Sequence, residues 1–271
     1  MTSRLSNALL SFALASVSLA SVPLTAASAQ IAVDRSELFI RPSVAAERIG
    51  VINVSNSSDH VVQAVVKIED WDRSAEGANR WFPVGSVAGS CGKALSVFPL
   101  SVRLDPGSSQ SIRLTLSDSA SALRQECWNA VMLETAQDTR TTGGMNYVVR
   151  TAVKVYVEPE GLRRDGEVTD VAVRPGSAGS DSVEVWFKNT GERHYVATGA
   201  LEFRRADNSL AARIALPDYY VLPGARQRTI VSVPTLPPGD YVALAIIDHG
   251  GAELSAMQLD YRVGASTSTR P

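Results

Sequence analysis

The sequence predicts an all-β protein that is built from two β-sandwich domains in tandem. Short segments alternate apolar and polar residues with a period of two, which is typical of half-buried strands. Turn-forming residues separate these segments at intervals of about 10–12 residues, as in sandwich folds. No helical pattern longer than two turns is present, although residues 117–124 are compatible with either a short helix or a loop. The pattern therefore argues against a helical bundle.

Four segments show the alternation most clearly. In the first of them, Val62, Ala64 and Val66 alternate with polar neighbours. In chain order the four segments are 62–69, 111–116, 183–188 and 244–247. Gly, Pro, Asn and Asp form turns between them, at residues 56–59, 105–107, 222–224 and 237–240. Because successive strand residues point to opposite faces, each segment is expected to bury one row of apolar side chains.

A charged segment that contains Pro159 and Gly161 shows no alternation and marks the boundary between the two domains. The first domain is predicted to span residues 30–159 and the second residues 160–264. The last residues of the chain, 265–271, are rich in Ser and Thr and are predicted to form a disordered tail.

The first residues, 1–29, have the pattern of a secretory signal peptide. Arg4 supplies a positive start, residues 8–20 are almost wholly small or apolar, and Ala27-Ser28-Ala29 fits a cleavage site. The apolar stretch is short for a membrane span, although an uncleaved anchor is the alternative interpretation. No other segment approaches spanning length, so we expect an exported protein without a membrane span.

Composition removes several functional classes. The chain has 26 basic and 28 acidic residues, which gives a formal net charge of −2 and no basic surface of the kind that nucleic-acid binding requires. No nucleophile elbow, phosphate-binding loop or dinucleotide-binding glycine pattern is present. We therefore expect no catalytic residues, no cofactor, no nucleic-acid partner and no enzymatic activity.

Metal binding is not expected either. The three histidines are scattered along the chain, and His60 and His194 lie in turn contexts where we expect solvated side chains. The acidic residues at 69–72 lack the alternating oxygen spacing of a calcium loop, so we interpret them as a solvated strand end.

The two cysteines are expected to form a disulfide. In an oxidising compartment Cys91 and Cys127 are more readily bonded than free, and neither belongs to a Cys-x-x-Cys redox motif. Two unpaired, buried thiols are the alternative.

Five segments, in order along the chain, resemble the periplasmic pilus chaperones of the chaperone–usher pathway, the PapD-like family. In residues 48–66 an Asn ends one strand and Gln63 begins the next, as in that family. Residues 97–113 contain a proline-bearing strand, a Leu-x-Pro-Gly turn and a following Gln-x-x-Arg pattern. Residues 124–129 contain an Arg-x-Glu pattern with an aromatic residue, and residues 153–159 contain a Lys-bearing strand. The fifth segment, residues 247–251, contains an Asp-x-Gly-Gly turn.

The resemblance implies two immunoglobulin-like domains arranged as an L with a cleft between them. In that family the last strand of the first domain is inserted into the open groove of a pilus subunit, which is an incomplete immunoglobulin-like domain. Counting back from Lys154 places Met145, Tyr147 and Val149 at the donor positions. An ordinary edge strand that packs on its own sheet is the alternative.

The family also anchors the terminal carboxylate of the subunit with a Lys and an Arg in the cleft. Lys154 matches the Lys, whereas Glu37 stands at the position of the Arg. Arg35 lies two residues away on the same face and could take the anchoring role. A structural ion pair for Lys154 is the competing interpretation.

The family braces its two domains with a Glu, an Arg and an Asp. Glu126 and Asp248 match two of these positions, but Glu158 stands where the Arg is expected. Three acids cannot brace one another without a cation or raised pKa values. We therefore expect compensation by Arg124, Arg150 or Arg163, or a different contact between the domains.

The resemblance implies a periplasmic chaperone that caps pilus or fibre subunits and delivers them to an outer-membrane usher. Two alternatives stay open: an exported two-domain β-sandwich that serves as a structural or surface-interaction protein, and, without a catalytic constellation to support it, a secreted hydrolase.

Overall fold

The structure, a computed structural model, describes residues 31–117, 123–136, 148–176 and 180–264. The predicted signal peptide and tail, together with Met145 and Tyr147, lie outside the described residues. In the described part, no helix is long and apolar enough to cross a membrane.

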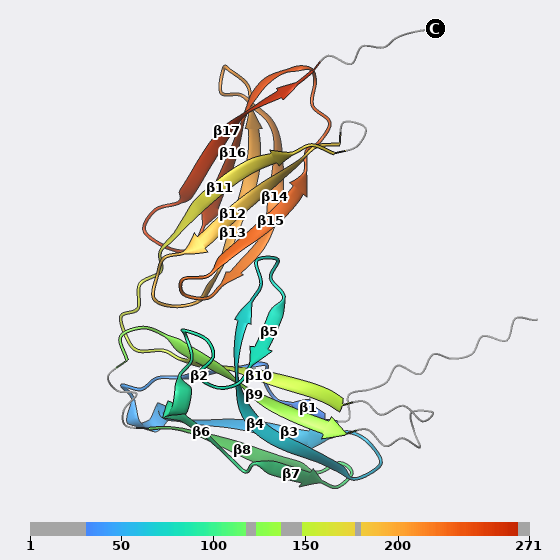
Figure 1. The fold of residues 1–271 in the computed structure, drawn as a ribbon, viewed down its shortest axis with the longest axis vertical. Coiled ribbons are helices and arrows are strands. Elements are labelled where there is room, and N and C mark those ends of the chain that lie inside the picture. Colours follow the sequence, from blue (N-terminus) through green and yellow to red (C-terminus); the bar gives the residue numbers. More distant parts are fainter. Residues whose placement is uncertain (1–30, 118–122, 137–147, 177–179, 265–271) are drawn as a thin grey trace, which may run out of the picture.

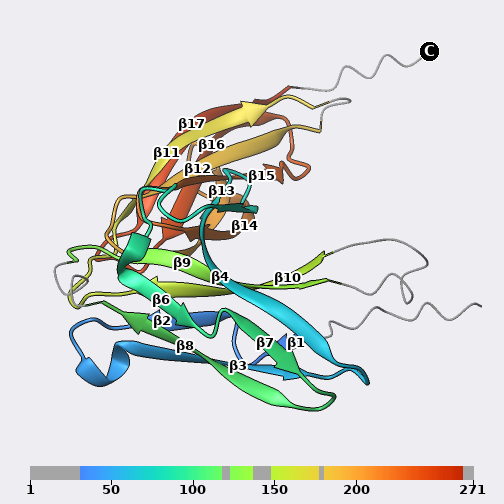
Figure 2. The same cartoon turned by 60° about the horizontal axis from the view of Figure 1, so that its bottom comes forward.

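The first sandwich packs two sheets against each other (Figures 1 and 2). One sheet has the order β1 (Ile31–Val33), β3 (Ile49–Asn56), β8 (Ser109–Leu116) and β6 (Leu95–Phe98). The other has the order β2 (Glu37–Ile40), β10 (Val148–Val157), β9 (Cys127–Ala136), β4 (Val62–Arg73) and β5 (Asn79–Phe82), and β7 (Ser101–Leu104) also pairs with β4. Two short 3₁₀ turns, η1 (Ala45–Glu47) and η2 (Gly92–Ala94), connect strands of this sandwich.

The second sandwich has a smaller and a larger sheet. The smaller one has the order β11 (Gly166–Arg174), β12 (Ser182–Asn189) and β15 (Arg226–Ser232). The larger one has the order β14 (Leu210–Val221), β13 (Tyr195–Arg204), β16 (Gly239–Asp248) and β17 (Ser255–Val263). The two sandwiches meet at an angle (Figure 1). This confirms the predicted all-β class and the tandem of two immunoglobulin-like sandwiches.

Each alternating segment buries one row of side chains, as predicted. Val62, Ala64 and Val66 lie in the core of the first sandwich, and Val183 and Val185 lie in that of the second. A third apolar cluster lies between the sandwiches and combines residues of both: Trp71, Trp128, Ala130, Tyr156 and Leu222. The two domains are therefore joined by an aromatic core of their own as well as by the connecting segment.

The predicted disulfide between Cys91 and Cys127 is present, and both half-cystines are buried. It ties η2 to the first residue of β9 across 36 residues of sequence. The bond therefore fixes the loop that leads from β5 to β6 against the central strand of the larger sheet.

The acidic segment at 69–72 is not a solvated strand end, because Asp70 is fully buried. Its carboxylate accepts hydrogen bonds from the Ser86 amide at 2.7 Å, the Ser90 hydroxyl at 2.6 Å and the Asn129 side-chain amide at 2.6 Å. These donors replace the water that a buried carboxylate loses. Asp70 thus organises the loop that carries Cys91, a role that local sequence spacing does not reveal.

We expect removal of the disulfide to destabilise the first sandwich. Closing a loop of this length restricts the unfolded chain, and its loss costs about 4 kcal/mol on the loop-entropy model. Urea denaturation of the Cys91→Ala/Cys127→Ala variant should show a lower midpoint for the first sandwich, while the transition of the second keeps its midpoint. Reductant should shift the natural protein in the same way and leave the variant unchanged. Equal midpoints for both proteins under oxidising conditions would contradict this role.

Candidate binding site between the two sandwiches

The last strand of the first sandwich, β10, is paired along its whole length on one side only. On that side, β9 pairs with every residue from Val148 to Val157. On the other side, β2 runs parallel to β10 and pairs only with its second half, from Lys154↔Glu37 to Val157↔Ile40. In the described part of the chain, no strand pairs with this side of Val148–Val153. Half of β10 is therefore an open sheet edge.

The crossing of the chain between sheets causes this gap. The segment before β2 belongs to the opposite sheet, where β1 pairs with β3. The chain crosses from one sheet to the other at residues 34–36, so β2 begins only at Glu37. The open edge is thus a product of topology.

The backbone groups of the open edge can be assigned from the hydrogen bonds next to it. The Lys154 amide donates to the Ser36 carbonyl at 3.0 Å, so the backbone hydrogen-bonding groups of Lys154 point toward the side of β2. Because backbone groups alternate sides along a strand, Val148, Arg150 and Ala152 also direct their amides and carbonyls away from β9. These groups form the available hydrogen-bonding row of the edge.

The side chains of β10 divide between two environments. Val153, Val155 and Val157 lie in the core of the first sandwich, whereas Tyr156 joins the cluster between the sandwiches. Val149 is half-buried on the same face as the three core valines. Val149, the predicted donor residue that lies within the described chain, therefore continues the apolar row of β10 toward the unpaired end of the strand.

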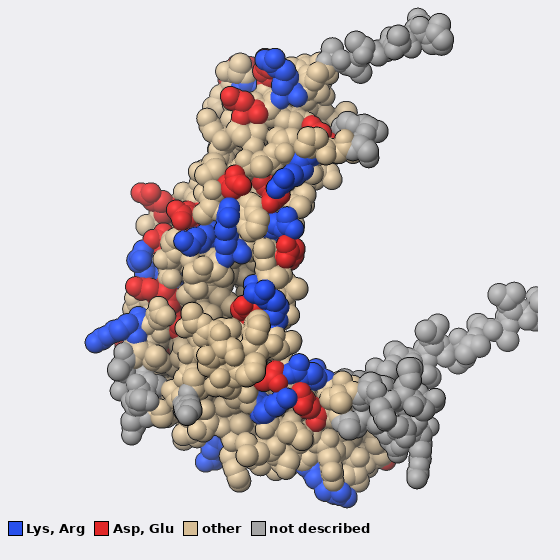
Figure 3. Space-filling view, in the orientation of Figure 1, with Lys and Arg blue, Asp and Glu red and all other residues tan. Residues whose placement is uncertain are grey.

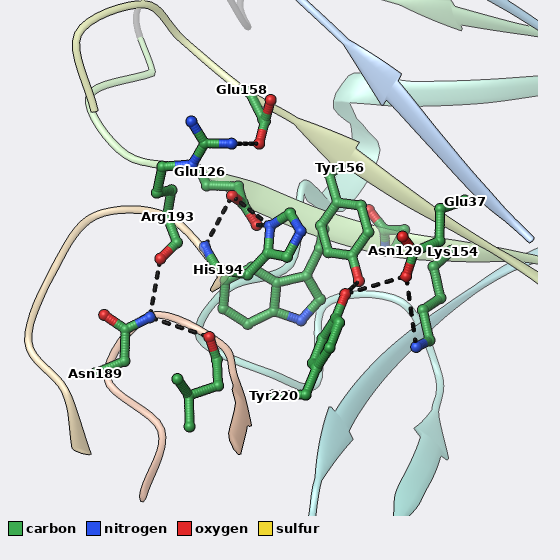
Figure 4. A network of polar contacts seen from close by, with 12 residues as sticks. Glu37, Glu126, Asn129, Lys154, Tyr156, Glu158, Asn189, Arg193, His194 and Tyr220 are labelled. Carbon is green, nitrogen blue, oxygen red and sulfur yellow. Dashed lines mark hydrogen bonds and ion pairs between the residues drawn. The ribbon is translucent and has the colours of Figure 1, made fainter. Parts of the chain in front are cut away.

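Lys154 lies where the open edge meets β2, on the face of the sheet that looks toward the second sandwich. Its Nζ atom is 3.8 Å from a carboxylate oxygen of Glu37, 4.8 Å from the ring centroid of Trp71 and 4.7 Å from that of Tyr220 (Figure 4). Cations are attracted to aromatic faces at these distances. Burial lowers the pKa of Lys154, although the neighbouring Glu37 acts to raise it. The Lys154 side chain is thus enclosed and still 18% exposed.

Arg35 has a different environment. It lies in the crossing segment, and its guanidinium donates to the Asp34 carboxylate at 3.0 Å. The same carboxylate accepts from the Asn53 side chain at 3.1 Å and the Asn53 amide at 3.0 Å. The positive charge of Arg35 is therefore already balanced by Asp34, and the Arg35 side chain is 44% exposed.

A stack of rings connects Lys154 to the junction between the sandwiches. The rings of Tyr156 and His194 are parallel, with centroids 3.8 Å apart, and the hydroxyls of Tyr156 and Tyr220 are hydrogen-bonded to each other. Tyr220 also donates to Glu37 at 3.2 Å. Burial raises the pKa of both tyrosines well above the usual value, so both are neutral hydrogen-bonding groups.

The predicted brace residue Glu126 is fully buried and contacts the second sandwich (Figure 4). Its carboxylate accepts from the His194 amide at 3.0 Å and lies 2.8 Å from His194 Nδ1. The expectation that His194 is solvated is wrong, because this residue is only 8% exposed. Its position directly before the alternating segment of β13 is the one sequence signal that could have indicated burial.

The second acid of the brace, Glu158, pairs with Arg193 at 2.7 Å. Arg150 and Arg163 are engaged elsewhere: the former pairs with Glu69 and Glu134, and the latter with Asp165. The partners of the two acids therefore come from the doublet Arg193-His194 of the second sandwich.

Asp248, the other predicted brace residue, lies at the end of β16, where its carboxylate accepts from the Gly250 amide at 2.8 Å. This contact caps the turn after β16 and lies within the second sandwich.

Glu126, Glu158 and His194 could each offer one ligand atom to a metal ion, because these atoms lie within 4.8 Å of one another. Each acid already has a protein partner, His194 for Glu126 and Arg193 for Glu158. These two contacts explain the cluster as a structural joint between the sandwiches.

A second contact joins the sandwiches on the side of the β4–β5 hairpin, which reaches the second sandwich in Figure 1. The Arg228 amide donates to the Ala75 carbonyl at 2.8 Å, and the Arg228 guanidinium pairs with Glu76 at 2.9 Å. The space-filling view is hollowed between the sandwiches (Figure 3). The junction is therefore held at two separate places, which restricts hinge motion around Lys154.

No protein-family model and no curated protein matches the chain. Solved structures with a similar course include one described as a chaperone–tip adhesin complex of CFA/I fimbriae biogenesis, at 14% identity over 88% of this chain and 100% of that chain, with a TM-score of 0.48. The class 5 fimbriae chaperone CfaA is 14% identical over 87% of this chain and 100% of that chain, with a TM-score of 0.47. The E. coli chaperone DraB is 14% identical over 86% of this chain and 98% of that chain, with a TM-score of 0.44. The identities and TM-scores are low, so these similarities concern the course of the backbone alone.

We expect Glu126→Gln to destabilise the protein far more than Glu158→Gln. Glu126 is buried against the backbone amide and the ring of His194. Leaving a buried hydrogen-bonding group without its full set of partners costs about 1–3 kcal/mol, whereas the pair of Glu158 with the partly exposed Arg193 contributes about 1 kcal/mol or less. Urea denaturation of both variants measures the difference, and the Glu158 variant is the matched control. Equal effects of the two substitutions would show that the buried Glu126–His194 contact does not hold the junction.

Proposed function

We propose that this chain is an exported chaperone that binds an incomplete immunoglobulin-like subunit of a pilus or fibre. It does so by offering the open half of β10 to the backbone of the subunit, in the manner of β-augmentation. Export to the periplasm and delivery of the subunit to an outer-membrane usher are parts of the same proposal. The signal-like segment 1–29 and the disulfide, which requires an oxidising compartment, support export.

The observation that carries the proposal is the place where β2 begins. An open edge is a template for another strand, and folded proteins usually protect such edges. A partner strand that runs parallel to β10, as β2 does, would move toward Glu37 and stop there, because β2 occupies the rest of the edge. The edge therefore suits a strand that ends at this point, and a chain terminus meets this condition.

The charge at the end of the open edge fits a terminal carboxylate. Lys154 lies at this point and retains exposed surface. Its ammonium group can donate a charge-assisted hydrogen bond to the carboxylate, which sets the register of the added strand. Glu37 opposes a second carboxylate, so a further cation is needed; Arg35 is the residue that the family resemblance suggests.

The apolar row of β10 gives the proposed complex its side-chain specificity. Val149 and, by the sequence alternation, Tyr147 and Met145 would fill the open groove of the subunit. A purely structural role would leave unexplained why an open edge, an apolar row and an enclosed lysine coincide on one strand.

We expect the mature protein, purified from the periplasm of its host by an affinity tag, to carry a small β-rich subunit in a 1:1 complex. Ala152→Pro should abolish the complex because it removes an outward amide of the open edge without breaking a ladder bond to β9. Lys154→Ala should do the same because it removes the proposed anchor. Mass spectrometry identifies the subunit, and size-exclusion chromatography measures the loss of complex.

Two variants serve as controls. Ala152→Ser keeps the amide, and Lys67→Ala removes a lysine that pairs with Glu69 and Glu134 on the same sandwich. Both should retain the complex. A complex that survives Ala152→Pro with an unchanged yield would show that the open edge of β10 is not the binding site.

A further inference from the structure

Two cations of the first sandwich lie against the ring of Tyr220, which belongs to the second sandwich. Lys154 Nζ is 4.7 Å from the ring centroid, and the guanidinium carbon of Arg73 is 4.9 Å from it. Arg73 is the last residue of β4 and belongs to the hairpin that contacts the second sandwich. No sequence motif singles out Arg73.

Arg73 has hydrogen-bonding capacity to spare. One of its terminal nitrogens donates to the Asn79 side chain at 3.2 Å, and its Nε atom is buried without a hydrogen-bond partner. No carboxylate of the described residues lies within 4.0 Å of its guanidinium, whereas Arg35 is paired with Asp34. An incompletely satisfied, half-buried guanidinium is unfavourable unless an acceptor reaches it.

The two cations act on each other. Burial lowers the pKa of Lys154; Glu37 opposes this shift, and the positive charge of Arg73 adds to it. Arg73 is thus close enough to repel the ammonium group. Glu37 balances one of the two positive charges, so one further monoanion would neutralise the group formed by Lys154, Arg73 and Glu37. This charge balance selects a single carboxylate.

We infer that Arg73, rather than Arg35, is the second cation that holds the terminal carboxylate of the partner strand. The inference rests on the proposed function, because it concerns the same end of the open edge. In this arrangement Lys154 binds the carboxylate from β10 and Arg73 binds it from β4. The planar guanidinium, resting on Tyr220, can donate two hydrogen bonds in a fixed orientation.

The test uses the final strand of the subunit captured by the mature protein, as two synthetic peptides. One peptide ends in the free carboxylate and the other in a carboxamide, which has the same shape without the charge. Calorimetry gives the affinity of each peptide for the natural chain and for the variants Arg73→Gln, Arg35→Gln and Arg103→Gln. Arg103 is an exposed arginine of the same sandwich and serves as the control.

We expect the natural chain to bind the carboxylate peptide about 10-fold or more tightly than the carboxamide. Arg73→Gln should lose most of this preference while its affinity for the carboxamide stays the same, which also shows that the variant is folded. Arg35→Gln and Arg103→Gln should keep the preference.

Two results would overturn the inference. A full preference in Arg73→Gln would remove Arg73 from the site, and a preference lost only in Arg35→Gln would assign the second cation to Arg35. Failure of the natural chain to capture a subunit, or to bind either peptide, would instead reject the proposed function itself.

Discussion

The partial pairing of β2 with β10 determines the layout of the proposed binding site. The chain enters the larger sheet of the first sandwich only at Glu37, after crossing from the opposite sheet, and so leaves half of β10 without a neighbour among the described strands. The same register places Glu37 beside Lys154. The start of β2 at Glu37 thus creates an open edge, marks where an added strand would have to stop, and places a charged pair at that point.

The junction between the sandwiches keeps this end of the edge in a low-dielectric setting. Trp71, Tyr156 and Leu222 form a shared apolar cluster, and Glu126 and His194 form a buried contact beside it. The β4–β5 hairpin adds a second attachment through Arg228 and the Ala75 carbonyl. Because the site is enclosed from two sides, charge interactions at Lys154 are stronger than on an open surface. A flexible hinge would lose that advantage.

Local periodicity was sufficient to predict both cores, since burial of Val62 or Val183 depends only on the alternation of its own strand. The disulfide was also predictable, from the predicted signal peptide and the number of cysteines. The site was predictable only in part. Lys154 and Glu37 could be aligned to a family pattern, whereas the Arg193–Glu158 pair and the Tyr156–Tyr220 contact join residues on different sandwiches. Such contacts depend on how two domains meet, which no local pattern contains.

Amide hydrogen exchange along β10, measured by NMR with and without the captured subunit, tests whether this edge is open in the free protein and covered in the complex. We expect fast exchange at Arg150 and Ala152 in the free protein, where their amides point away from β9, and slow exchange at Thr151 and Val153, whose amides bond to β9. Addition of the subunit should slow exchange at Arg150 and Ala152 selectively. Slow exchange at these two amides in the free protein, or no change on binding, would contradict this expectation.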